Sequence, residues 1–224
     1  MLTDAEIKRM QFLLQLRETH FTDGIRNMDF SGADLNKADL HGMQLVNVNF
    51  EGAILDGVNL YDSQLVNCNF NNTSLKRAIL RKSSILDCSF KNSKLSQSDL
   101  SDSGIYNSRF IDTDMHFTKL INSKVVNTTF ENCLFSNSNI SGICMTGIIM
   151  DRCDLQYSII DKSFICGCTL MNSKFNYASL NSAIIYDNKI ENSDTENVLM
   201  LDAKIDQNFA KLNNIRQIDV KIIT

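Results

Sequence analysis

The chain has 224 residues, 43% of them hydrophobic, with no tryptophan, no proline and a formal net charge of −4. This length fits one domain, and no segment approaches the ~18 consecutive apolar residues that a membrane-spanning helix needs. The first residues, MLTDAEIKRM, are charged where a secretory signal peptide would be apolar. The composition therefore predicts a soluble cytoplasmic protein, and it leaves open secretion by a dedicated machine.

The segment 1–24 has the pattern of a short helix. Thr3 and Glu6 have the spacing of a capping box. Apolar residues then recur at helical spacing: Ile7, Met10, Leu13 and Leu14. We expect this helix to cap the segment that follows, because an open end would expose apolar surface and unpaired strand edges.

From residue 25 to residue 207 the sequence repeats every five residues. A large apolar residue stands at the positions whose numbers are multiples of five, without a break from Phe30 to Ile190. The residue two places before it is small in most units, as Ala33 and Cys68 are. Neither a strand, with a period of two, nor a helix, with a period of 3.6, explains this spacing. Each unit needs its neighbours in order to bury its apolar residue.

A longer period of twenty residues lies over the first. Phenylalanine occupies positions 30, 50, 70, 90, 110 and 130, whereas leucine occupies positions 40, 60, 80, 100 and 120. Four pentapeptides therefore make one coil, and the pattern predicts a solenoid of about eight to nine coils with phenylalanines stacked on one inner wall. With coils spaced like paired strands, ~4.8 Å apart, the rod would be roughly 40 Å long.

Several units resemble those of a known family. ADLNK (33–37), ADLHG (38–42), SDLSD (98–102) and CDLQY (153–157) are similar to the A(D/N)LXX unit of pentapeptide-repeat proteins. The resemblance covers about four-fifths of the chain. It implies an all-β fold, a right-handed quadrilateral β-helix, and a bacterial origin. It says little about function, because members of this family have unrelated roles.

The segment 208–224, NFAKLNNIRQIDVKIIT, departs from the repeat after a first irregularity at Thr195. Its apolar residues follow helical spacing at first and then alternate as in a strand: Phe209, Leu212 and Ile215, then Ile218, Val220 and Ile222. We expect a C-terminal cap, a dimerisation segment or both, and the choice between helix and strand stays open.

Catalytic and metal-binding patterns are weak. Five of the seven cysteines stand at the small inward position, where a free cysteine behaves as a small hydrophobe: Cys68, Cys88, Cys133, Cys153 and Cys168. The histidines, His20, His41 and His116, lie outside the coils that carry these cysteines. The sequence has no glycine-rich phosphate loop and no H-E-x-x-H motif. We expect no catalytic residue, no metal site and no cofactor.

Two surface features stand out. The first is an apolar column just after one inward wall, with two apolar neighbours near its end: Val46, Val66, Leu86, Tyr106, Val126 and Tyr186, with Phe164 and Ile184 beside it. Strand propensity explains part of it; the alternative is a flat binding or dimerisation face. The second is a basic belt that follows an acidic first third: Lys76, Arg77, Arg81 and Lys82. It is either a solvated surface or a site for an acidic partner or a phosphate.

The function that fits best is a non-enzymatic interaction protein, a rigid rod that docks on a partner protein as a scaffold or secreted effector. The resemblance also implies an alternative, a DNA-mimicking modulator of type II topoisomerases such as gyrase, dimeric through its C-terminal ends. Charge weighs against it: residues 26–190 hold 15 Lys and Arg against 16 Asp and Glu, whereas DNA carries one charge every ~1.7 Å. We expect no direct contact with nucleic acid; the partner and the oligomeric state stay open.

Overall fold

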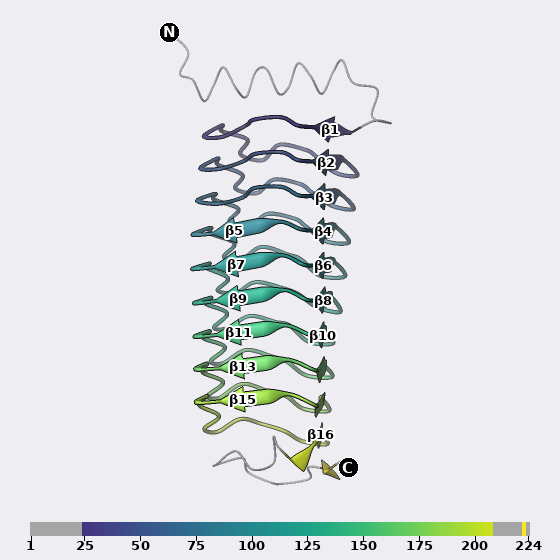
Figure 1. Ribbon diagram of the computed structural model, residues 1–224, viewed down its shortest axis with the longest axis vertical. Helices are drawn as coiled ribbons and strands as arrows, with labels where there is room; N and C mark the ends of the chain where they lie inside the picture. Colours follow the sequence, from purple (N-terminus) through teal and green to yellow (C-terminus); the bar gives the residue numbers. More distant parts are fainter. Residues whose placement is uncertain (1–23, 208–220, 223–224) are drawn as a thin grey trace.

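The computed structural model describes residues 24–207 and 221–222, and these form a parallel β-helix whose coils are stacked along one axis (Figure 1). Sheet A has eleven strands: β1 (Ile25–Arg26), β2 (Gln44–Val46), β3 (Gln64–Val66), β4 (Ser84–Leu86), β6 (Gly104–Tyr106), β8 (Lys124–Val126), β10 (Cys144–Thr146), β12 (Phe164–Cys166), β14 (Ile184–Tyr186), β16 (Lys204–Ile205) and β17 (Lys221–Ile222). Sheet B has six strands: β5 (Ser89–Lys91), β7 (Arg109–Ile111), β9 (Thr129–Glu131), β11 (Ile149–Asp151), β13 (Thr169–Met171) and β15 (Lys189–Glu191).

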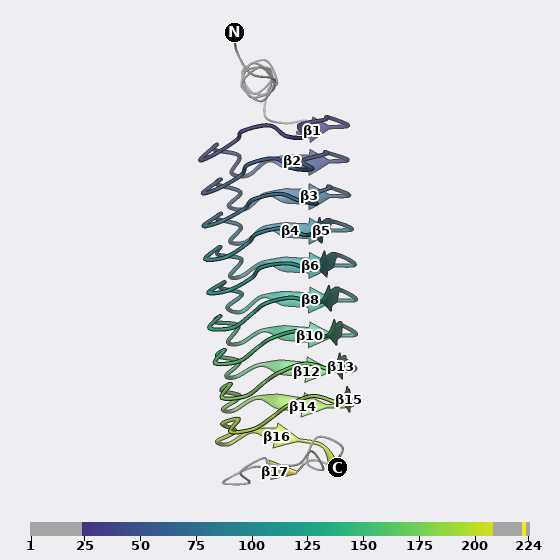
Figure 2. The ribbon, with the colours of Figure 1, turned by 90° about the vertical axis from the view of Figure 1, so that its left-hand side faces the viewer.

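The predicted period of twenty residues is confirmed by the strand register. In sheet A, Leu45 pairs with Leu65 and Leu65 pairs with Ile85, all in parallel (Figure 2). The two other walls are held by isolated parallel bridges with the same offset, such as Asp34↔Ile54 and Asp39↔Asn59. Four walls of one pentapeptide each make one coil, and there are about nine coils. The predicted quadrilateral β-helix is therefore correct.

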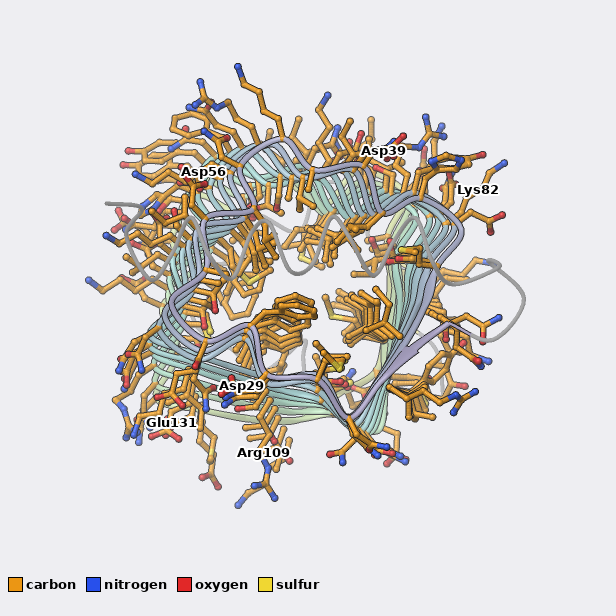
Figure 3. The ribbon with its side chains drawn as sticks, turned by 90° about the horizontal axis from the view of Figure 1, so that it is seen from above. Asp29, Asp39, Asp56, Lys82, Arg109 and Glu131 are labelled. Atoms are coloured by element: carbon orange, nitrogen blue, oxygen red, sulfur yellow. The ribbon has the colours of Figure 1, made fainter. Side chains whose placement is uncertain are left out.

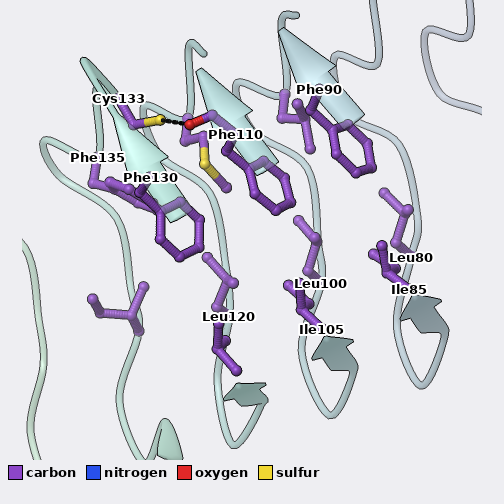
Figure 4. Close-up of a cluster of buried hydrophobic side chains, with 14 of the residues drawn as sticks. Leu80, Ile85, Phe90, Leu100, Ile105, Phe110, Leu120, Phe130, Cys133 and Phe135 are labelled. Carbon is purple, nitrogen blue, oxygen red and sulfur yellow. Dashed lines mark hydrogen bonds between the residues drawn. The ribbon is translucent and has the colours of Figure 1, made fainter. Parts of the chain in front are cut away.

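The inward apolar residues form one buried core along the rod. Phenylalanine rings stack along the wall of sheet B, with centroids 5.1 Å apart for Phe50 and Phe70 and 4.5 Å apart for Phe90 and Phe110. Isoleucines of sheet A, such as Ile85, and leucines of the opposite wall, such as Leu80, complete this buried cluster (Figure 4). Charged side chains such as Asp56, Lys82 and Glu131 point away from the axis, as the view along the rod shows (Figure 3).

The small inward residues connect neighbouring coils. Thr73 Oγ1 donates a hydrogen bond to the Phe50 carbonyl at 2.8 Å, and Ser123 Oγ donates to the Leu100 carbonyl at 2.7 Å. The thiol of Cys133 contacts the Phe110 carbonyl at 3.2 Å, marked by the dashed line in Figure 4. A side chain with a donor at this position therefore satisfies a carbonyl of the preceding coil without interrupting the apolar interior.

Each pentapeptide turns at the residue two places after its inward residue. This residue has a positive φ throughout the described coils, for example 55° at Asn27 and 56° at Asp62. Asparagine, aspartate and glycine tolerate this left-handed conformation best, and they hold most of these corners. The backbone N–H of the corner residue donates to a carbonyl of the next coil, as from Asn47 to Val66 at 2.9 Å. Local sequence and inter-coil hydrogen bonds thus fix the corner together.

The ends are described only in part. Lys221 and Ile222 form β17, which pairs in parallel with β16 and adds one strand to sheet A. The helix expected in 1–24 and the rest of 208–224 lie outside the described residues, apart from Gly24, so both caps and their boundaries stay predictions. Thr195 breaks the apolar pattern but keeps its inward place, because it is buried. Within the described ranges, no helix has the length and apolar character to cross a membrane.

Candidate interaction surfaces

The apolar column predicted from the sequence lies in one row on the outer face of sheet A, with Thr146 and Cys166 between Val126 and Tyr186. Each member is the third residue of its strand and is half-buried. Register places Val46 beside Val66, Leu86 beside Tyr106, and Tyr106 beside Val126. Phe164 and Ile184 begin β12 and β14 and pair with each other. We call the outward side chains of β2 to β14 the sheet A face.

The sheet A face carries almost no charge. Lys124 is its one charged side chain; the first positions of the other strands hold glutamine, serine, glycine, cysteine, phenylalanine and isoleucine. Sheet B differs sharply, because five of its six strands present charged residues: Lys91, Arg109, Glu131, Asp151, Lys189 and Glu191. Strand propensity favours β-branched and aromatic residues at the outward positions of either sheet, so propensity alone does not explain why only one face is apolar.

Aromatic side chains lie against the sheet A face. The ring of Tyr106 covers Gly104, where a Cβ atom would come within 2.6 Å of the ring. Phe164 and Tyr186 meet edge to face, with ring centroids 5.5 Å apart and planes at 80°. Half-buried rings that rest on the sheet in this way offer broad apolar contact.

The structure divides the predicted basic belt between two corners of one coil. Arg81 and Lys82 already have partners: Arg81 binds Asp102 at 2.7 Å, and the Lys82 ammonium lies over the Tyr61 ring, 5.5 Å from its centroid. The hydrogen bond between Arg81 and Asp102 raises the pKa of the guanidinium and lowers that of the carboxyl group.

Lys76 and Arg77 are exposed on the other corner, and neither takes part in an ion pair within the described part of the chain. The belt is therefore not one convergent anion site. Two of its four charges are committed to neighbouring coils, and the wall around Leu80 separates the two pairs.

A third surface escaped the sequence interpretation. Phe117, Tyr157 and Tyr177 occupy the same corner of their coils, with φ of 57°, 59° and 60°, and their exposed fractions are 56%, 55% and 49%. The two tyrosine rings stack with centroids 5.2 Å apart and planes at 6°. We call these three residues the aromatic corner. The signal was present in the sequence, because aromatic residues stand where asparagine, aspartate or glycine is usual.

The aromatic corner places bulky side chains in an unfavourable backbone conformation. A left-handed conformation costs a residue other than glycine roughly 1–2 kcal/mol, and bulky side chains are genuine outliers there. These rings remain about half exposed, so a large part of their apolar surface stays in water. Such strain at an exposed site is a reason to look for a functional role.

The histidines and inward cysteines of the described coils have contacts that are local to the coil. No group of three or more His, Cys, Asp or Glu side chains is placed to hold a metal ion within residues 24–207 and 221–222. His41 and His116 each contact the aspartate two residues earlier, Nδ1 to Oδ1, at 2.8 and 2.7 Å. The five inward cysteines are buried, and desolvation raises the pKa of Cys168 to about 11. A buried thiol with such a pKa is a poor nucleophile.

Comparisons with known proteins agree with the fold. A family profile described as "Pentapeptide repeat region" matches residues 83–160, and one described as "Pentapeptide repeats (8 copies)" matches residues 25–52 and 44–81. Together these matches span more than half of the chain. A search of curated proteins gave no match.

Several solved structures are similar to this chain at low sequence identity. QnrB1, a plasmid-mediated fluoroquinolone resistance protein, is 14% identical over 84% of this chain and 93% of its own, with a TM-score of 0.49. HetL of Nostoc sp. strain PCC 7120, involved in heterocyst differentiation regulation, is 15% identical over 87% and 95%, with a TM-score of 0.44. Rfr23 of Cyanothece 51142 is 20% identical over 47% and 83%, with a TM-score of 0.41. The repeat, the four-walled coil and the profile matches together establish that this chain belongs to the pentapeptide-repeat family.

Proposed function

We propose that this protein is a non-enzymatic binding protein, a rigid rod that docks on a partner protein through the sheet A face. The observation that carries the proposal is the contrast between the two sheets. One outer face holds a single charge, Lys124, among half-buried aliphatic and aromatic side chains, whereas the other is charged on most strands. The core of a protein interface is depleted of charge and enriched in aromatic residues in the same way.

The sheet A face is smaller than one side of a standard protein interface. The steps from β2 to β14 cover ~34 Å at strand spacing, and three residues cover ~10 Å across, so the face measures roughly 340 Å². A standard interface buries about 800 Å² on each side. The sheet A face is therefore the apolar centre of a larger contact, whose polar rim comes from the adjoining corners.

A triple variant tests this proposal. Tyr106→Glu, Val126→Glu and Tyr186→Glu together would place carboxylates in the contact, where they would lose hydration without partners. The matched control is Ile111→Glu, Thr129→Glu and Met171→Glu, which adds the same charge to outward positions of sheet B. Both proteins should keep the wild-type circular dichroism spectrum, since the altered side chains point away from the core.

Two binding measurements separate these variants. Light scattering reports self-association through the face, and quantitative cross-linking in lysate reports foreign partners. We expect the sheet A variant to lose association that the sheet B control retains. Equal association of the wild type and both folded variants would refute the proposal.

The alternative is a modulator of type II topoisomerases that imitates DNA. The charge distribution weighs against it, because basic residues neutralise acidic ones on the rod, as Arg152 does by pairing with Glu131 and Asp151. A supercoiling assay with purified gyrase decides between the two. Inhibition of supercoiling, or protection of gyrase from a quinolone, would favour the alternative.

A further inference from the structure

The aromatic corner is a second surface, separate from the sheet A face. It lies between the two walls that are held by isolated bridges, and sheet A borders neither side of it. Its backbone is fixed by inter-coil hydrogen bonds, from Phe117 N to the Ser136 carbonyl at 3.3 Å and from Tyr157 N to the Asn176 carbonyl at 3.2 Å. The corner therefore presents its rings from a rigid support.

One ring position in this row is occupied by a small residue. Tyr157 and Tyr177 stand on consecutive coils and stack at 5.2 Å, but Phe117 and Tyr157 are two coils apart, with the exposed Asn137 between them. Two coils measure about 10 Å, and stacked rings in this protein are 4.5 to 5.8 Å apart. The Asn137 side chain is shorter than its two aromatic neighbours, and we call the position over it the notch. At this coil spacing a planar group in the notch would lie at stacking distance from both rings.

The wall beside the notch adds apolar surface and negative charge. Register places Leu134 between Asp114 and Asp154, one coil to either side, and Leu134 is 40% exposed. Partial burial acts to raise the pKa of Asp114, but hydrogen bonds from His116 outweigh it and hold the pKa below its ordinary value. The wall thus offers an apolar patch flanked by two carboxylates.

We propose that the notch between Phe117 and Tyr157 binds the guanidinium group of an arginine side chain on a partner protein. Guanidinium is planar and stacks on aromatic faces, and it is attracted by the ring faces and by carboxylates. The methylene groups of arginine can pack on Leu134 while the charged end reaches the notch. Lysine has no planar group, and a nucleotide would bring its phosphates toward Asp114 and Asp154.

The experiment uses the full chain and a defined probe, the peptide acetyl-Gly-Arg-Gly-amide, with matched peptides in which citrulline or lysine replaces arginine. Ring-proton NMR signals of Phe117 and Tyr157 are followed during titration, together with the Cδ protons of the arginine. We expect saturable shifts of both rings, and upfield ring-current shifts of the arginine protons, because the group lies between two ring faces. The citrulline and lysine peptides should bind about tenfold more weakly.

A pair of variants makes the test specific. Asn137→Tyr fills the notch and should remove the shifts, whereas Asn197→Tyr introduces the same residue in the same left-handed conformation, on the coil after Tyr177, and should leave them unchanged. The structure already holds tyrosine at two such corners, so both variants should fold. Lack of saturable shifts, equal binding of citrulline, tighter binding of adenosine monophosphate, or arginine binding that survives Asn137→Tyr would each overturn the proposal. The triple variant of sheet A should bind the peptide normally, which keeps this test independent of the proposed docking face.

Discussion

The rings of Phe90 and Phe110, one coil apart, lie nearly parallel, with centroids 4.5 Å apart and planes at 2°. Both side chains are fully buried. Each ring is therefore packed by the ring above and the ring below, so a residue in one coil depends directly on its equivalent in the next.

The first prediction concerns this stack. Phe90→Ala should lower the free energy of unfolding by about 3–5 kcal/mol, because it removes buried surface and leaves a cavity between two rings. Phe70→Asp and Phe90→Asp should prevent folding, since an unpaired charge would also be buried. Urea denaturation followed by circular dichroism measures the loss. A wild-type midpoint in any of these variants would show that the stack contributes little to stability.

A second prediction contrasts Phe117 with the buried phenylalanines. Phe117→Asn should raise stability by about 1 kcal/mol, because asparagine tolerates a φ near 57° and the exposed ring is lost at little cost. Phe110→Asn is the control and should be strongly destabilising. Thermal melts of both variants check the signs. A destabilised Phe117→Asn would mean that the ring makes contacts that outweigh its backbone strain.

The third prediction concerns a small apolar cavity among the last coils, lined by Ile165, Leu170, Phe175, Leu180, Ile185, Ile190, Thr195 and Val198. It lies where the phenylalanine stack has given way to Met150, Leu170 and Ile190. Ile190→Phe should fill it and raise stability by about 0.5–2 kcal/mol. Leu120→Phe, an enlargement on the opposite wall of a filled coil, should destabilise by about 1–3 kcal/mol. Two variants that shift the unfolding midpoint in the same direction would contradict this account.

The fourth prediction is a pH dependence at Asp114. Its pKa in the folded protein lies below the ordinary 3.8, with hydrogen bonds from His116 overcoming the opposite effect of burial. The folded state thus favours the ionised carboxyl group. Its contribution to stability is present above about pH 3.8 and is lost as the pH falls through the folded pKa.

Melting temperatures of the wild type and of Asp114→Asn, recorded from pH 6 to pH 3, measure this contribution. The advantage of the wild type should shrink on acidification. His116→Gln, which keeps the carboxyl group but removes the ring donor, should lose part of the same advantage at neutral pH. A difference that stays constant over the whole range would exclude Asp114 as the source.

The sequence by itself determined the coil. The hydrophobic effect requires every pentapeptide to bury one large residue. The period of five, the coil of twenty residues and the inward place of Phe70 or Leu80 can therefore all be read from the sequence pattern. The small residues at the inside corners follow from the same constraint. The sequence also predicted correctly that Val46 and Tyr106 share an outward row, because a coil of twenty residues fixes which residues are aligned from one coil to the next.

Only the tertiary structure decided what the outside of the rod presents. Outward residues are not selected by burial, so their pattern does not reveal their contacts. Arg81 is committed to Asp102, twenty-one residues away, and the basic belt divides between two corners. Phe117 and Tyr157 stand on either side of Asn137 only because the coils are stacked in register. Each pentapeptide specifies its own inward residue, because that residue must be buried. A surface site combines side chains of different coils, and these side chains come close to one another only in the folded chain.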